Sequence, residues 1–108
     1  MILKIDTTNT NEVKVGLVSA KDGIQKKLTV KRKFGSQALL PAIVKILKKN
    51  NLQISDISHI EVNPGPGSFT GTRVGVAVAN ALGFALNVSV NGKKGRIVVP
   101  IYEKSKFD

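Results

Sequence analysis

The sequence predicts an α/β fold, with one mixed sheet of about five strands and two main helices in the order βββαβαβ. Residues 1–30 hold short apolar runs and the period-two alternation that β-strands require. Residues 36–50 and 70–86 instead carry apolar residues at the spacing of an α-helix. Short apolar runs at 59–62 and 88–90 follow the two helices, which indicates alternating strands and helices in the second half. A chain of 108 residues is expected to form a single core.

The first three strands are predicted to form an antiparallel meander. Residues 1–6 are a short apolar run that ends at the polar cluster DTTNTNE. The segment 13–19 then alternates apolar and polar residues. A Lys-Asp-Gly turn at 21–23 joins it to a similar segment at 24–30.

The two helices differ in how clearly their ends are marked. Ser36 is the expected N-cap of the first helix, and Lys48 and Lys49 suit its C-terminus, where cations complement the helix dipole. Pro41 falls near the first turn, so it either marks a later start or kinks the helix. The tight turn NPGPGSFTG leads into the second helix.

Composition excludes most catalytic sites. The chain has no Cys, so it cannot form a disulfide, a thiolate zinc site or a Cys nucleophile. With a single His, we expect neither a Ser-His-Asp triad nor a multi-histidine metal site. We therefore expect no metal and no cofactor. Seventeen Lys and Arg against seven Asp and Glu give a formal net charge of +10, which attracts phosphate backbones, acidic proteins or anionic lipid surfaces.

The chain is expected to be cytoplasmic and to have no membrane contact. Its first residues, MILKIDTT, carry charges at positions 4 and 6 and lack the apolar core of a secretory signal. The longest run poor in polar residues, 74–86, is shorter than the roughly 17 to 25 residues that a membrane span needs.

Two stretches are more particular than the general pattern. Residues 62–75, VNPGPGSFTGTRVG, resemble the GPGSFTGxRxG signature of the TsaB family, and MILKIDTT is similar to that family's opening strand and loop. Between them, SQALLPAIVKIL is similar to the family's first helix. The resemblance covers residues 1–90 in order, and the tail VVPIYEKSKF is similar to a P-x-Y segment near the end of many relatives.

This resemblance implies a fold and a function. The fold is a single ribonuclease H-like lobe of the actin and hexokinase superfamily, over residues 1–91, with a short basic tail at 92–108 and without the second lobe of longer relatives. The function is a non-catalytic scaffold or activator that pairs with the TsaD-type catalytic subunit, or with a second copy of itself. That subunit transfers a threonylcarbamoyl group to an adenine beside the tRNA anticodon. A small basic RNA-binding module is the alternative.

A partner interface is predicted on the two helices. Small residues recur every four positions along the second helix and form a ridge that would let another helix approach closely. The alternative, that the ridge seats the helix on its own sheet, is left open by the sequence; the resemblance favours the interface. The predicted interface residues are Leu40, Ile43, Val44, Leu47, Gly71, Gly75, Ala79 and Gly83.

Two further sites are weighed. The end of the first strand and the glycine-rich turn are candidates for a phosphate or ligand loop, made of Asp6, Thr7, Thr8, Gly65, Gly67 and Ser68. Because no P-loop Lys follows, we favour a structural turn with unusual backbone angles at Gly65, Gly67 and Gly71, and we expect no ATP hydrolysis.

The candidate RNA contacts are the cations Lys26, Lys27, Lys31, Arg32 and Lys33. A solvated edge strand is the favoured interpretation of this run, and without neighbouring aromatics any contact with tRNA would be weak and directed at phosphates.

Overall fold

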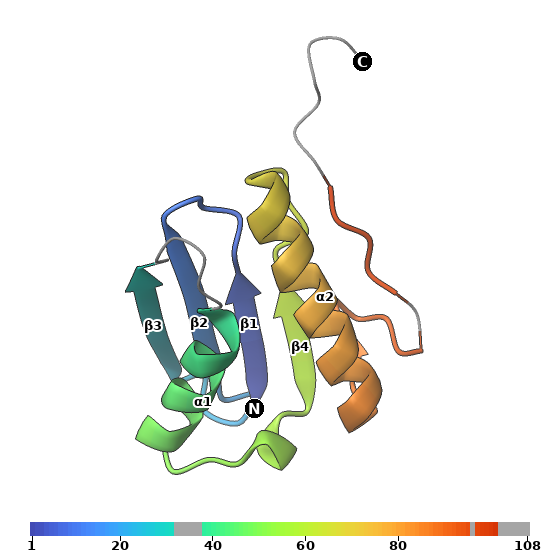
Figure 1. The fold of residues 1–108 in the computed structure, drawn as a ribbon. Helices are drawn as coiled ribbons and strands as arrows, with labels where there is room; N and C mark the ends of the chain where they lie inside the picture. The colour runs from blue at the N-terminus through green and yellow to red at the C-terminus, as the bar shows by residue number, and fades with distance from the viewer. Residues whose placement is uncertain (32–37, 96, 102–108) are drawn as a thin grey trace, which may run out of the picture.

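The computed structural model describes residues 1–31, 38–95 and 97–101, and the predicted order of elements is confirmed (Figure 1). A short 3₁₀ helix at Ile54–Asp56, between the first helix and the fourth strand, was not predicted. The strands and helices are β1 (Ile2–Asp6), β2 (Glu12–Val18), β3 (Gln25–Lys31), α1 (Leu39–Lys49), β4 (His59–Val62), α2 (Phe69–Leu86) and β5 (Ser89–Val90).

The five strands form one mixed sheet in the order β3-β2-β1-β4-β5. β1 pairs with β2, and β2 with β3, in antiparallel register, which confirms the predicted meander. β4 joins the other side of β1 in parallel, and β5 joins β4 in parallel. The tight turn before β3 is held by Asp22, whose Oδ1 accepts the amide of Ile24 at 3.0 Å, and by the positive φ of Gly23.

Both helices lie on the same face of the sheet (Figure 1). α1 packs on β2 and β3, whereas α2 packs on β4, β1 and β5. The alternating strand residues on this face are buried with the inner rows of the helices, and Leu3, Leu17 and Ile60 are among the most deeply buried. The core therefore lies between one face of the sheet and the two helices.

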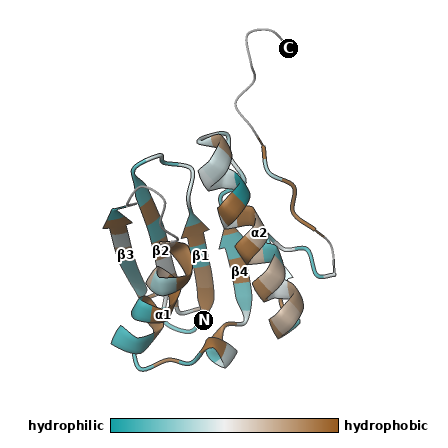
Figure 2. Cartoon of the chain, in the orientation of Figure 1, coloured by the Kyte–Doolittle hydropathy of each residue, from teal (hydrophilic) through white to brown (hydrophobic). Residues whose placement is uncertain are grey.

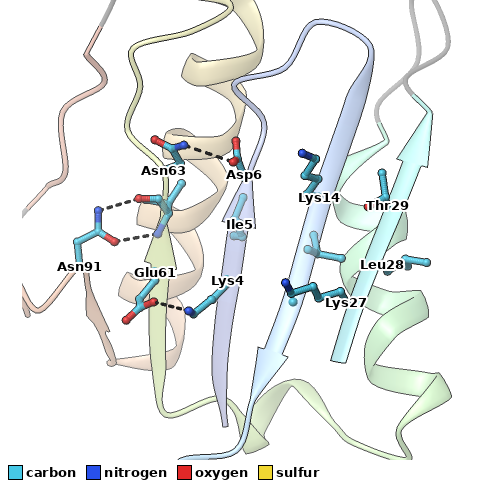
Figure 3. Close-up of a pocket in the computed structure, with 13 residues that line it drawn as sticks. Lys4, Ile5, Asp6, Lys14, Lys27, Leu28, Thr29, Glu61, Asn63 and Asn91 are labelled. Atoms are coloured by element: carbon cyan, nitrogen blue, oxygen red, sulfur yellow. Dashed lines mark hydrogen bonds and ion pairs between the residues drawn. The ribbon is translucent and has the colours of Figure 1, made fainter. Parts of the chain in front are cut away.

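The opposite face of the sheet is polar and hollowed. A cavity of about 640 Å³ lies over it, with Gly16 of β2 among its lining residues and Lys4, Lys14 and Lys27 around it (Figure 3). Across this face Lys4 forms an ion pair with Glu61 at 3.6 Å. Exposed ion pairs of this kind contribute little to stability.

The start of α1 differs from the prediction. The helix begins at Leu39, and Ala38 occupies the N-cap without a side-chain hydrogen bond. Pro41 is the third residue of the helix, where its missing amide would have no intrahelical partner, so it neither ends nor interrupts α1. The predicted cap, Ser36, lies outside the described residues.

α2 is longer than the apolar run used to argue against a membrane span. It has 18 residues, and among the described residues it is the one helix long and apolar enough to cross a membrane by length and composition. The argument from the length of that run was therefore wrong. In the structure the inner row of α2 packs on the sheet, with a third of the helix buried.

The segment after β5 turns back along α2. Lys93 pairs with Val90 through a turn whose two central residues, Asn91 and Gly92, have positive φ. Residues 97–101 then run beside α2 (Figure 1). Asn80 fixes this segment, because its amide donates to the carbonyl of Val98 at 2.9 Å and accepts from the Val98 amide at 3.0 Å.

Candidate functional site

The end of β1 forms a corner with the glycine-rich turn. Asp6 uses both carboxylate oxygens there: Oδ1 accepts the Thr8 amide at 3.0 Å and the Thr8 hydroxyl at 2.6 Å, and Oδ2 accepts the amide of Asn63 at 3.3 Å (Figure 3). Asn63 in turn accepts the Gly65 amide through Oδ1 at 3.1 Å. Asp6 therefore ties its own loop to the turn after β4.

The protonation of Asp6 follows from these contacts. Partial burial raises the pKa of its carboxyl, but the hydrogen bonds from Thr8 and Asn63, with the charge of Lys14, outweigh burial and lower the pKa below its ordinary value. Asp6 is ionised at neutral pH.

The glycine-rich turn is shaped by close approach as well as by backbone angle. Gly65 has φ +108° and lies so close to the carbonyl of Ile101 that a side chain would clash. Gly67 has no positive φ, yet a Cβ there would lie 2.5 Å from the Cβ of Thr8. The prediction of unusual backbone angles is confirmed for Gly65. It is wrong for Gly67, which is needed for space, and for Gly71, which lies within α2.

Ser68 starts α2. Its side chain accepts the Gly71 amide at 3.3 Å, and its own amide donates to the carbonyl of Thr8 at 2.8 Å. Thr7 is fully buried and donates its hydroxyl to the carbonyl of Gly71. The predicted loop residues are thus brought together, and their hydrogen bonds are largely made within the chain.

The predicted interface ridge is wrong in its placement. Gly71, Gly75, Ala79 and Gly83 are buried against the chain's own sheet and first loop. A Cβ on Gly75 would meet the side chain of Thr7, and one on Gly83 would meet Val90. The small residues let α2 lie close to β1 and β5, so they cannot contact a partner.

The remaining predicted interface residues lie on α1, and only some of them are exposed. Ile43 and Leu47 belong to the core, which corrects their assignment, whereas Leu40 and Val44 are 50% and 49% exposed. On α2 the next row of small residues, Ala77, Ala81 and Ala85, is exposed instead of the predicted ridge. Both rows are small and apolar, so the sequence does not show which of them faces the sheet.

Each helix therefore keeps an apolar row outside the core. The helices lie over the same face of the sheet (Figure 1), and the residues of both rows are exposed or only partly buried. Asn80, also on α2, holds the tail. We call the resulting surface the helix face; it consists of Leu40, Val44, Val74, Ala77, Val78, Ala81 and Ala85.

Comparison with known proteins identifies the family. The family model described as "TsaD: tRNA N6-adenosine threonylcarbamoyltransferase" matches residues 29–92, which is more than half of the chain. The chain belongs to this family. The TsaB protein of Bacillus subtilis is 33% identical over 90 residues, which cover 83% of this chain and 39% of that protein. TsaB of Buchnera aphidicola is 46% identical over 50 residues, covering 46% of this chain and 23% of that protein.

The solved structures agree with the TsaB resemblance. YeaZ from Pseudomonas aeruginosa superposes with a TM-score of 0.74 at 29% identity, over 82% of this chain and 42% of that one. The TsaB (YeaZ) resemblance and the α/β fold of this superfamily are therefore confirmed. The chain spans about two fifths of the length of the Bacillus and Pseudomonas proteins. The predicted boundary at residue 91 stays a prediction.

The cations of this TsaB-like chain are only partly placed. Lys26, Lys27 and Lys31 are exposed on β3, an edge strand of the sheet, as predicted. Lys27 lines the cavity on the open face, and Lys26, the neighbouring residue, points to the other side. Arg32 and Lys33 lie outside the described residues.

No group of three or more His, Asp or Glu side chains that could hold a metal ion occurs in the described part of the chain.

Proposed function

We propose that this chain is a non-catalytic, partner-binding subunit in the threonylcarbamoyladenosine modification of tRNA. It pairs through the helix face with a TsaD-type catalytic subunit or with a second copy of itself. Its named relatives are biosynthesis proteins for this modification, and they are about two and a half times as long as the stretch matched here. A tRNA-linked role implies a cytoplasmic protein.

The observation that carries the proposal is the exposure of the helix face. Leu40 and Val44 are each half exposed although they are large and apolar. On α2, three exposed alanines, each one helical turn from the next, leave the backbone of the helix accessible to a close neighbour. Exposed apolar rows of this kind are suited to helix-on-helix packing, and burying them would remove apolar area from water.

The β1 corner supports a non-catalytic role. Both oxygens of Asp6 accept hydrogen bonds from the chain itself, and Gly65 and Gly67 lie so close to Ile101 and Thr8 that neither position has room for a side chain. These contacts account for the residues that a phosphate loop would use. Their function is to join β1, the turn and α2.

An association assay tests the proposal. Ala81→Glu places a charge in the middle of the helix face, where it would be buried without a partner on association. Thr29→Glu is the matched control, because it adds the same charge to an exposed position on the opposite side of the sheet. With a tagged TsaD-type subunit, and separately with the chain alone, Ala81→Glu should abolish pairing and Thr29→Glu should retain it. Equal binding by both variants would remove the helix face from the proposal.

The alternative of an RNA-binding module on β3 rests on Lys26, Lys27 and Lys31. These cations have no aromatic residue between them along the strand, so they favour contact with phosphates only. It remains the second candidate.

A further inference from the structure

A long stretch of the chain contains basic residues and no acidic ones. Residues 62–101 contain no Asp or Glu, although they make up α2, β5 and the tail segment. Their described cations, Arg73, Lys93 and Lys94, are all exposed. This stretch therefore carries cations without acidic residues, whereas on the open sheet face cations and acids are mixed and Lys4 is paired with Glu61.

Large apolar side chains are exposed within the same stretch of chain. Phe84 is 89% exposed, Phe69 is 57% exposed, and Ile97 on the tail is 76% exposed. Figure 2 shows apolar residues along both α2 and the tail. We call this surface the tail face; it consists of Phe69, Arg73, Phe84, Lys93, Lys94 and Ile97.

These residues share one side because of helical spacing. Phe69, Arg73, Asn80 and Phe84 stand at positions i, i+4, i+11 and i+15, which fall on one side of an α-helix. Asn80 holds Val98 from this side, so the tail runs along the row that ends at Phe84. The two phenylalanines are about 22 Å apart along the helix axis, from 1.5 Å per residue.

Arg73 makes a cation–π contact on this side of α2. Its guanidinium lies over the ring of Phe69, 5.3 Å from the ring centre. A nucleobase is planar and also stacks on aromatic rings, while neighbouring cations contact its phosphates. This stretch has exposed rings as well as exposed cations, whereas β3 has cations and no aromatic residue.

We propose that the tail face binds single-stranded RNA, with a base stacked on Phe84 and phosphates held by Lys93 and Lys94. This inference rests on the proposed function, since an unpaired loop of tRNA would supply such a strand. It moves the RNA contact from β3 to the other edge of the molecule. An acidic protein would satisfy the cations but gives no reason for two separate exposed rings, and an anionic lipid surface is tested directly below.

Direct binding to the chain alone tests the proposal without a partner protein. The probe is a short fluorescein-labelled oligoadenylate, followed by anisotropy over a series of salt concentrations. Phe84→Leu keeps apolar bulk and removes the aromatic ring; since a stacked base contributes a factor of about ten or more, binding should weaken about tenfold. Circular dichroism should be unchanged, because the side chain is almost fully exposed.

A matched pair of charge variants locates the phosphates. Lys93→Gln with Lys94→Gln should lower the log-log salt slope by about 1.4, since each phosphate contact on a single strand contributes about 0.7. Lys26→Gln with Lys27→Gln removes the same charge from β3 and should leave the slope nearly unchanged. Equal changes in both pairs, full affinity in Phe84→Leu, or no binding of oligoadenylate would each overturn the proposal.

Two further results separate it from other functions. Co-sedimentation with phosphatidylserine vesicles that is abolished by Phe84→Leu, without any RNA binding, would show a lipid surface and overturn the RNA assignment. Loss of RNA binding in Phe84→Leu with normal binding to a TsaD-type subunit is expected, because the helix face is intact. If Ala81→Glu fails to disrupt pairing while the RNA results hold, the proposed interface fails and the tail face stands.

Discussion

At the scale of single residues, close packing rather than ligand binding explains the glycine-rich turn of this chain. The turn NPGPGSFTG is rich in glycine, and such turns can bind phosphate. Here Gly67 makes room for Thr8, and Gly75, in the second turn of α2, makes room for Thr7. The glycines allow two loops and a helix to meet without side chains between them.

Gly75→Ala should destabilise the fold. The new methyl group would press on the buried side chain of Thr7, and overpacking of this kind costs roughly 1 to 3 kcal/mol. Ala81→Leu, on the exposed row of the same helix, should change the free energy of unfolding by less than about 0.5 kcal/mol. Urea denaturation of both variants measures the difference. Equal stability of the two would mean that the glycine row is not packed on the first loop.

Asp6 should make stability depend on pH at the acidic end. Its pKa is lowered in the folded chain, so its contribution is present above its pKa in the unfolded chain, about 3.9, and is lost as pH falls through the folded value. Asp6→Asn removes the charge and the acceptor for Asn63. The gap in unfolding free energy between wild type and Asp6→Asn should therefore narrow below about pH 4. A gap that is constant down to pH 2 would contradict this linkage.

At the scale of elements, α2 shows how far the sequence leads. Its existence and extent could be predicted from apolar spacing and from the turn NPGPGSFTG that precedes it. Its orientation could not, because Gly71, Gly75, Ala79 and Gly83 form one small-residue row and Ala77, Ala81 and Ala85 form another. Only the positions of Thr7 and Val90, which come from distant strands, decide which row is buried.

The candidate site, like α2, could be predicted only in part. Asp6 and the glycine-rich turn were correctly placed together, because strands β1 and β4 are parallel neighbours whose ends meet at one edge. The tail face was missed. The absence of acidic residues from 62 to 101, a stretch that contains Phe69 and Phe84, could be read in the sequence, but the exposure of the two rings could not. Which side of α2 those rings occupy depends on Asn80 and the tail, and these contacts are tertiary.

Asn80→Leu should release the tail from α2. The variant removes both hydrogen bonds to the backbone of Val98 and leaves the sheet and its helices otherwise intact. Amide exchange at Val98 should accelerate, while exchange at Leu3 and Leu17 in β1 and β2 stays slow. Unchanged protection at Val98 would show that the buried side chain of Val98, rather than Asn80, holds the segment.

At the scale of the whole molecule, the excess of positive charge makes stability depend on the salt concentration. The formal net charge is +10, and the molecule extends over 46 × 31 × 23 Å. The Debye length is about 30 Å at 0.01 M salt and about 3 Å at 1 M, so cations on opposite sides repel one another at low salt and not at high salt. Self-repulsion of this kind destabilises the compact state.

The melting temperature should therefore rise with sodium chloride. Reversing Lys26, Lys27 and Lys31 to Glu removes two charges at each position and lowers the net charge from +10 to +4, and all three side chains are exposed. The variant should melt higher than wild type at 0.01 M salt, and its rise with salt should be smaller, because less repulsion remains to be screened. Thermal melts of both proteins across the salt series measure this. An equal rise in the two proteins would assign the salt effect to burial of apolar surface, which salt also strengthens, and not to the charge that the β3 lysines add.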